Sequence, residues 1–541
     1  MRVAWMLGGI LGLSAVAAAS PNLSFETVIN QGDAIAGDEF SSAGQVVVGP
    51  NGSVGIVGLL ENSGNPIVIY STPAGGGTWN SQPVAVGGTS YTIPSIPGAE
   101  DFDYFDNLAI SGNPSNGTRL TFDAEDGNNN QGIIQWDAGT TSLGDVAFDG
   151  DSKGYNSVGA TADSGGPSLE MQVNGTGQAM FPAIASAQSP PSNSVILRGD
   201  DSASPSPNYI TPIFTSSGSL TNSNDPGSRV ALGADNSGAA VLRAAASPSP
   251  APNPNPNPDV YIIPANGSAP TPLPLGSDTL STFADPIIGY ASGNGINQTT
   301  LMLVNGSTPR SQDIVLSKNG GAPQPILAQY TQPTLYEATE GQMTPNGQIA
   351  VYVPNTTGDT IQYANAASAN SNASVVASVY SGSGPVPNTA LALDPTGTNL
   401  DIEALTSPGS TAGPEINSSG TIIFNAEVGT SPSDEKAALL DWLPGDQSPE
   451  ILLAAGDEVD IDGNMVTIDD FYQNSLSNDY DYYKNGLNDQ NGIAVGVDYT
   501  GGPDGGGSAV LYAAISGVPE PSTIALASIA GFGLLRRRRR Q

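Results

Sequence analysis

A short repeat constrains this chain more than any other feature of its sequence. A turn built on Asn-Gly or Gly is followed by residues that alternate between apolar and polar. The Asn-Gly step favours backbone with positive φ, and the alternation is typical of a half-buried strand. Copies recur roughly 63 residues apart, which indicates a repeat architecture. The turns lie at Gly52, Gly117, Gly177, Gly238, Gly347, Gly420 and Gly492, with a weaker copy near Gly295.

A second recurring element is an apolar segment that ends in a Gly-Asp step. Full copies are centred on Gly32-Asp33 and Gly456-Asp457, and each is followed by a short return segment. A partial copy ends at Gly199-Asp200. Gly followed by Asp between two strand-like segments favours a turn. We therefore expect hairpins at these places.

Units of this length with several short strands predict an all-β fold. We expect a β-propeller of seven or eight blades, with tandem β-sandwich modules as the alternative. The stretch from Glu435 to Leu443 is predicted to be a strand that ends a repeat. The proline-rich segments Ser202–Pro207 and Ser247–Pro258 are predicted to be solvated loop insertions between strands, because the repeat continues on both sides of them.

Composition excludes several classes of function. The 541 residues include no Cys and no His. Without them there can be no disulfide, no thiol nucleophile, no histidine metal site and no Ser-His-Asp triad. Only carboxylate, Lys or Tyr chemistry remains for an enzyme, and with 51 acidic residues some carboxylate pair always looks plausible. We therefore assign no catalytic residue.

The net charge of −36 argues against nucleic acid and anionic lipid as binding partners of the body. It fits an extracellular surface or divalent cations. The best cation candidate is Glu458-Val459-Asp460-Ile461-Asp462-Gly463 with Asp469 downstream, which approximates a calcium loop. Flanking helices are missing and both end positions depart from the pattern, so a solvated hairpin turn is favoured. No cofactor is assigned, although a divalent cation such as calcium stays open.

Two segments mix acids with aromatic residues, namely Asp101–Asn107 and Asp479–Tyr483. Rings that stack on sugars, with carboxylates bound to hydroxyls, would make carbohydrate sites. Strand alternation with one packed and one wet face explains the same pattern and is favoured.

Both ends of the chain have the features of transport segments. Residues 1–19 contain Arg2, an apolar stretch from Val3 to Val16 and a small-residue cleavage site, so a signal peptide cut between Ala19 and Ser20 is expected. The other end begins with Pro519, Glu520 and Pro521, whose prolines keep the backbone extended for a processing enzyme. An apolar run from Thr523 to Leu535 follows. A basic stop then comes at Arg536, Arg537, Arg538, Arg539 and Arg540, as the positive-inside rule requires of a cytoplasmic end.

This order of parts resembles the PEP-CTERM sorting signal of bacterial surface proteins, with Pro519, Glu520 and Pro521 matching its defining triplet. The resemblance implies export, recognition by a membrane-embedded exosortase-type transpeptidase, and removal or exchange of the tail. The apolar run would span roughly 20 Å as a helix, against roughly 30 Å of hydrocarbon. A temporary single-pass anchor in the inner membrane therefore fits better than a permanent one. The repeats in the body are similar to those of tandem-repeat exported proteins that often carry this tail.

The predicted organisation is a signal peptide at 1–19, a repeat-containing β domain at 20–516 and a sorting and anchor segment at 517–541. We expect a protein of the cell surface, outer envelope or extracellular matrix. Its expected role is non-enzymatic adhesion or association with extracellular polysaccharide. The alternative is a polysaccharide hydrolase or lyase that uses carboxylates on a β-propeller.

Overall fold

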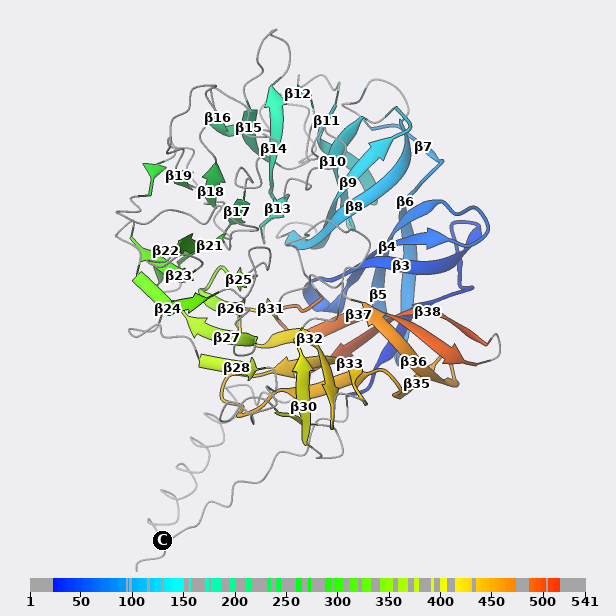
Figure 1. Cartoon of the computed structure of the whole chain (residues 1–541). Helices are drawn as coiled ribbons and strands as arrows, with labels where there is room; N and C mark the ends of the chain where they lie inside the picture. The colour runs from blue at the N-terminus through cyan, green and yellow to red at the C-terminus, as the bar shows by residue number, and fades with distance from the viewer. Residues whose placement is uncertain are drawn as a thin grey trace, which may run out of the picture.

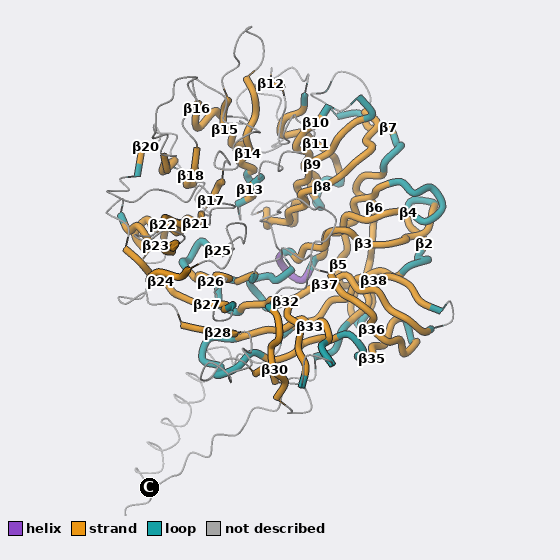
Figure 2. Tube along the Cα trace, viewed as in Figure 1, coloured by secondary structure: helices purple, strands orange, loops and turns teal. Residues whose placement is uncertain are grey.

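A computed structural model of the chain shows strands arranged in a ring around a centre (Figure 1). Turns and the 3₁₀-helix η1 (Pro50–Gly52) lie near that centre (Figure 2). The structure describes residues 23–515 with gaps, and every structural statement below concerns the described residues. The longest gaps are 157–170, 186–193, 200–210, 216–230, 245–258, 274–287, 332–340, 379–390, 406–413 and 473–485.

The described strands form eight sheets that follow one another along the chain. Neighbouring strands are antiparallel apart from one contact between β29 and β34. The first two sheets comprise β2 (Ala34–Ile35), β3 (Asp38–Val48), β4 (Val54–Leu60), β5 (Pro66–Gly75) and β6 (Thr78–Val86), then β7 (Ser90–Tyr91), β8 (Glu100–Asn113), β9 (Gly117–Asp126), β10 (Gln131–Asp137) and β11 (Ser142–Phe148). The next two comprise β12 (Tyr155–Asn156), β13 (Gln172–Val173), β14 (Ala179–Ala185), β15 (Ser194–Gly199) and β16 (Thr211–Thr215), then β17 (Ala231–Ala234), β18 (Ala240–Ala244), β19 (Asp259–Ile263) and β20 (Thr271–Pro272).

The second half of the ring repeats the same meander. Two four-stranded sheets comprise β21 (Ile288–Gly293), β22 (Ile296–Asn305), β23 (Ser311–Lys318) and β24 (Gln324–Thr331), then β25 (Gly341–Met343), β26 (Gln348–Val353), β27 (Thr360–Asn365) and β28 (Ser374–Ser378). A six-stranded sheet follows with β29 (Leu391–Leu393), β30 (Asn399–Ala404), β31 (Glu415–Ile416), β32 (Ile422–Gly429), β33 (Lys436–Trp442) and β34 (Glu450–Ala454). The last strands are β35 (Glu458–Ile461), β36 (Asn464–Tyr472), β37 (Gly492–Gly501) and β38 (Gly506–Ala514).

The two ends of the body meet in one sheet. The first strand, β1 (Glu26–Asn30), pairs antiparallel with β38, the last. We call the sheet β1-β38-β37-β36-β35 the closing sheet. Hydrogen bonds between the first and last described strands close the ring, as in propeller-like repeat folds. The prediction of an all-β repeat architecture is confirmed, and β33 confirms the strand expected between Glu435 and Leu443.

The repeated turns form because one side chain satisfies the backbone of the bend. In the turn Asn417–Thr421, the N–H of Asn417 donates to the carbonyl of Thr421, and the Oδ1 of Asn417 accepts the N–H of Thr421. The same pair of bonds joins Asn174 to Gln178, Thr344 to Gln348 and Asn488 to Gly492. We call 49–53, 344–348, 417–421 and 488–492 the inner turns.

In the inner turn 488–492, the residue with positive φ is one position earlier than the glycine by which the repeats were aligned. Gly347 and Gly420 hold positive φ at the fourth place of their turns, at +84° and +88°. In the turn 488–492 the fourth residue is Asn491, with φ +61°, and Gly492 is the fifth. Asn tolerates this backbone region better than most residues, so the Asn-Gly step is used in a shifted register.

The predicted Gly-Asp turns are present and share their hydrogen bonds. The expected hairpins across them do not form, because β1 pairs with β38 and β34 pairs with β33, so each Gly-Asp turn connects two sheets. The carboxylate of Asp33 accepts the N–H of Asn30 at 2.8 Å, and the carboxylate of Asp457 accepts the N–H of Ala454 at 2.7 Å. Each aspartate accepts a hydrogen bond from the last residue of a strand, β1 or β34. After that strand the chain passes into the next sheet. The hairpins β2–β3 and β35–β36 follow directly.

The proline-rich segments lie outside the described residues, but the strands that flank them pair with each other. β18 pairs with β19, and β15 pairs with β16. Ser247–Pro258 and Ser202–Pro207 therefore connect neighbouring strands within one sheet, as predicted.

Aromatic contacts join successive sheets. Tyr70 contacts Trp136 of the next sheet, with ring centroids 5.0 Å apart. Tyr363 contacts Trp442 and Tyr512 contacts Trp79, both at 5.1 Å, and these pairs also bridge neighbouring sheets. Each tyrosine lies across from a glycine or alanine on the adjacent strand, which leaves room for its ring. Three of the four tryptophans of the chain are thus used between sheets.

Candidate functional site

The inner turns are joined into a chain of hydrogen bonds around the centre. The amide Nδ2 of Asn346 donates to the carbonyl of Ser418 in the next turn, at 2.6 Å. Asn417 donates in the same way to Asn488, and Asn488 donates to Gly49, both at 2.9 Å. One asparagine amide per turn therefore links four successive sheets, including the first to the last. The side-chain amides of Asn346, Asn417 and Asn488 thus connect neighbouring sheets of the ring.

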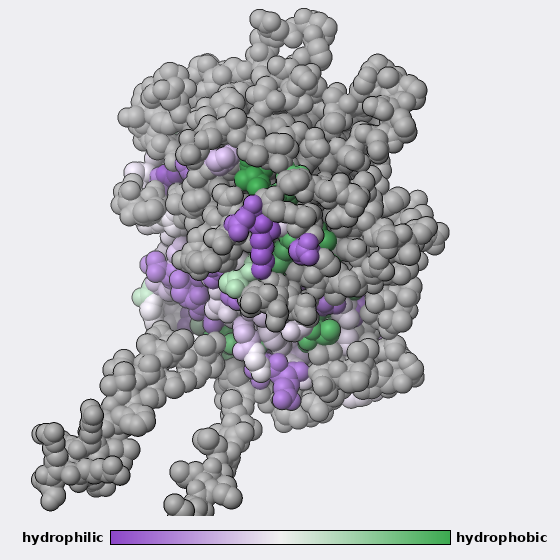
Figure 3. Space-filling view, turned by 90° about the vertical axis from the view of Figure 1, so that its left-hand side faces the viewer, coloured by the Kyte–Doolittle hydropathy of each residue, from purple (hydrophilic) through white to green (hydrophobic). Residues whose placement is uncertain are grey.

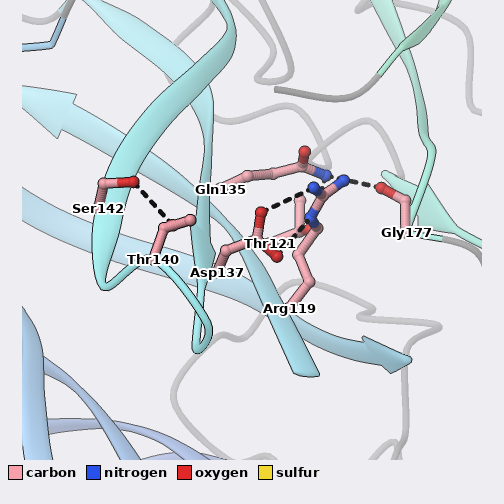
Figure 4. Close-up of polar contacts among 7 residues, drawn as sticks. All are labelled: Arg119, Thr121, Gln135, Asp137, Thr140, Ser142 and Gly177. Atoms are coloured by element: carbon pink, nitrogen blue, oxygen red, sulfur yellow. Dashed lines mark hydrogen bonds and ion pairs between the residues drawn. The ribbon is translucent and has the colours of Figure 1, made fainter. Parts of the chain in front are cut away.

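A buried ion pair lies between the second and third sheets (Figure 4). Arg119 on β9 stands directly opposite Asp137 on β10, and its Nη2 is 2.8 Å from the carboxylate Oδ2. Arg119 is 5% exposed and Asp137 is 7% exposed. Removing two charges from water is costly, so such a pair needs close geometry and further hydrogen bonds.

The next sheet covers this ion pair. Gln135, opposite Thr121 on the same strand pair, donates its Nε2 to Thr121 Oγ1 and to the carbonyl of Gly177, both at 2.9 Å. A Cβ on Gly177 would lie 3.1 Å from the Cδ of Arg119, and its φ of +83° also favours glycine. The cluster is therefore a closed joint between two sheets.

The equivalent place in a later sheet has a different chemistry. Asp441 on β33 stands opposite Ile423, as Asp137 stands opposite Arg119. Asp441 is 1% exposed and its Oδ1 has no hydrogen-bond partner. Burial raises the pKa of Asp441 well above its ordinary value, and the nearby carboxylates of Glu450 and Asp446 raise it further. A neutral carboxyl group is therefore favoured there.

The calcium-loop candidate lies on the β35–β36 hairpin. Glu458 and Asp460 alternate with the more buried Val459 and Ile461 along β35. The carboxylate of Asp460 accepts the N–H of Gly463 at 2.8 Å. Within the part of the chain that is described, no group of three or more acidic side chains is placed to hold a metal ion. The geometry is that of the solvated hairpin favoured from the sequence.

The acid-aromatic segment Asp101–Asn107 lies on β8. Phe102 and Phe105 are buried in the core, whereas the ring of Tyr104 is 46% exposed and its hydroxyl donates to Asp106 at 3.1 Å. Strand alternation, interrupted by bulges, accounts for the pattern. The second segment, Asp479–Tyr483, lies outside the described residues.

The transport segments also lie outside the described residues. These include the cleavage site at Ala19 and Ser20, the motif at Pro519, Glu520 and Pro521, and the basic stop from Arg536 to Arg540. In the part that is described, no helix is long and apolar enough to cross a membrane.

Sequence reasoning missed the ion pair and the linking asparagines. A signal for Arg119 existed, because it is one of few basic residues in the body and stands two residues after the Gly117 turn. Most other copies have an apolar or small residue two places after the turn glycine, such as Ile422 or Ile349. Asn417 and Asn488 open their turns, three and four residues before the glycines by which the repeats were aligned.

Several solved structures are distantly similar to this chain. The acylaminoacyl peptidase of Pyrococcus horikoshii is 9% identical with a TM-score of 0.37, and the match covers 86% of this chain but only 58% of the peptidase. A lectin of Aleuria aurantia is 11% identical with a TM-score of 0.29, covering 65% of this chain and 99% of the lectin. The polysaccharide lyase Uly1 is 8% identical with a TM-score of 0.34, covering 77% and 97%. Likenesses this weak carry no argument about function. No curated protein matches the sequence.

One comparison is specific. The family model described as the PEP-CTERM protein-sorting motif matches residues 517–540. It includes the Pro519-Glu520-Pro521 triplet, the apolar run and the arginines. This confirms the resemblance seen in the sequence. The chain therefore carries a PEP-CTERM sorting signal and is an exported, envelope-associated protein whose tail is recognised by an exosortase.

Proposed function

We propose that this protein is displayed at the cell surface or in the extracellular matrix, where it acts without catalysis in adhesion or in association with polysaccharide. The observation that carries the proposal is the use of polar groups at the inner turns. Asn346, Asn417 and Asn488 donate to the next turn instead of facing a ligand. Arg119, a cation that an active site could use, is buried against Asp137.

The described surface supports a loose polymer contact. On the side drawn in Figure 3, the coloured residues are mostly hydrophilic, and hydrophobic ones form small separate patches. Tyr104 on β8 is exposed, and its hydroxyl donates to the carboxylate of Asp106. An aromatic ring beside a carboxylate can stack on a sugar ring while the carboxylate accepts hydrogen bonds from the sugar hydroxyls.

Co-sedimentation of the purified protein with insoluble and acidic polysaccharides tests the proposal. We expect binding that Tyr104→Ala weakens by about 3- to 10-fold, the equivalent of one aromatic contact. Leu59, 38% exposed on β4, provides the matched control, and Leu59→Ala should leave binding unchanged. Equal loss in both variants, or no binding to any polysaccharide, would contradict the proposed contact.

The alternative function is polysaccharide cleavage by carboxylates. It predicts that incubation with polymer shortens the chains and releases new reducing ends or unsaturated sugars. The same samples should therefore be analysed for product size. Catalytic release of oligosaccharides would replace the non-enzymatic proposal with the hydrolase or lyase.

A further inference from the structure

The closing sheet and its neighbour, the first sheet β2–β6, have two distinct ends. In the closing sheet Gly492 pairs with Ala514, and Glu26 pairs with Tyr512, so these residues share one end. The inner turn 488–492 lies there, and Asn488 bonds to Gly49 of the first sheet. We call this the turn end. Thr500 pairs with Gly506 at the opposite end, about 30 Å away along the strands.

The opposite end is formed by the β2–β3 and β35–β36 hairpins, which follow the two Gly-Asp turns, and we call it the hairpin end. Phe40 pairs with Leu60 there, far from the turn 49–53. The Gly32-Asp33 turn lies at this end of the closing sheet, because the N–H of Gln31 donates to the carbonyl of Ser508 at 2.8 Å. Burial raises the pKa of Asp33, and the charge of Asp462 on the other hairpin also raises it. Exposed carboxylates gather at this end: Asp33, Glu39, Glu61, Glu458, Asp460 and Asp462.

The turn end is much less charged. The β5–β6 hairpin lies at this end, because Ser71 pairs with Val54 beside the inner turn. Residues 72–80 of that hairpin carry no charge. Among the described residues of the turn end in these two sheets, the carboxylates are Glu26 and Asp489. That of Asp489 is held by two hydrogen bonds from Ser418.

Both ends of the described chain leave the ring at the turn end. Ile515 is 5% exposed, and its N–H donates to the carbonyl of Asn491 at 2.8 Å. The chain is therefore fixed up to Ile515. Four residues further on is Pro519, which can lie no more than about 14 Å from Ile515. The apolar run starts at Thr523, at most about 28 Å away.

We propose that the turn end of the closing and first sheets faces the lipid bilayer surface while the sorting signal is processed, with the hairpin end pointing away. The short spacer forces the ring to lie close to the membrane in which the exosortase acts. An anionic bilayer would repel the carboxylates of the hairpin end, whereas the turn end presents few charges. This goes beyond the proposed role in adhesion and does not depend on it.

A quenching experiment tests this orientation on the full-length chain in phosphatidylethanolamine–phosphatidylglycerol vesicles. The protein has no Cys, so Ala74→Cys at the turn end and Met465→Cys at the hairpin end each give one labelling site. Both native residues are exposed. A fluorophore at position 74 should be quenched by headgroup-attached quenchers at least about 3-fold more than one at 465, given the ~30 Å between the two ends. Equal quenching, or more at position 465, would overturn the proposal.

Charge variants test it in cells. Ala74→Glu with Asn80→Asp adds charge at the turn end, and Met465→Glu with Asn464→Asp adds the same charge at the hairpin end. We expect the first pair to slow tail processing, followed by intact mass, at least about 3-fold, and the second pair to leave it unchanged. A long Gly/Ser spacer inserted after Ile515 should restore processing of the first pair, which separates proximity from misfolding. Equal effects at both ends, or no rescue by the spacer, would refute the orientation.

Discussion

Asp137 and Asp441 occupy equivalent places in two sheets, yet one is paired with a cation and the other is not. Each lies near the end of its strand, opposite a residue near the start of the preceding strand. Asp137 faces Arg119, and Asp441 faces Ile423. Both aspartates are buried, at 7% and 1% exposure.

The difference shows that the repeat determines which position is buried, but not whether the residue at that position is charged. In three other sheets the same place holds Tyr70, Tyr363 or Tyr512, each opposite a small residue. Where an aspartate takes the place, its carboxylate must be neutralised by a partner or by a proton. The first solution makes the joint depend on Arg119. The second makes the joint depend on pH.

The largest effect is expected from Asp137→Asn. This change leaves the guanidinium of Arg119 buried without its counter-charge, which should cost about 3–5 kcal/mol of unfolding free energy. Denaturant unfolding monitored by tryptophan fluorescence measures it, since Trp136 is adjacent. The double variant Arg119→Met, Asp137→Leu should recover most of the loss. If Asp137→Asn is neutral, the ion pair does not hold this joint.

The same substitution at the equivalent place, Asp441→Asn, should have the opposite sign. The raised pKa means that the folded state binds a proton that the unfolded state has already lost. The wild-type protein therefore loses stability as pH rises from the ordinary aspartate pKa of about 4 towards the raised value. Asp441→Asn should gain on the order of 1–3 kcal/mol at pH 8, with a smaller gain near pH 4. Thermal unfolding across that pH range is the measurement, and a loss of stability at pH 8 would contradict the comparison.

A smaller effect is expected where the next sheet covers the ion pair. Gly177→Ala places a Cβ 3.1 Å from Arg119 Cδ at a φ of +83°, which should cost about 1–2 kcal/mol. Gly32→Ala is the matched control, because its φ is +87° and nothing lies within 4 Å. The excess cost at Gly177 measures the contact alone. Equal costs at the two glycines would mean that the contact between Gly177 and Arg119 can accommodate a methyl group.

Local patterns predicted the elements that are built locally. The turns at Gly347 and Gly420 lead into β26 and β32, and the Gly-Asp steps form turns, because a few neighbouring residues satisfy each bend. The shift at Asn491 escaped the alignment, since Asn and Gly can both adopt positive φ.

The joints between sheets could not be predicted from local patterns. Arg119 meets Asp137 only through the register of β9 on β10, and Gly177 comes from another sheet. Asp441 meets Glu450 after a bulge between Leu439 and Leu440 shifts the pairing. A shift of one residue exchanges the two faces of a strand, so residue type alone cannot say which charges meet.

The pairing of β1 with β38 has a consequence for how this protein folds. The two strands are separated by nearly the whole chain, so the ring closes late and at a large cost in loop entropy. In export that starts from the N-terminus, β1 emerges first and its partner emerges last. Until then β1 has no partner strand, and an open strand edge invites pairing between molecules. A chaperone that holds the early strands, or a slow folding rate before closure, would keep the exported chain from aggregating while it waits for its final strand.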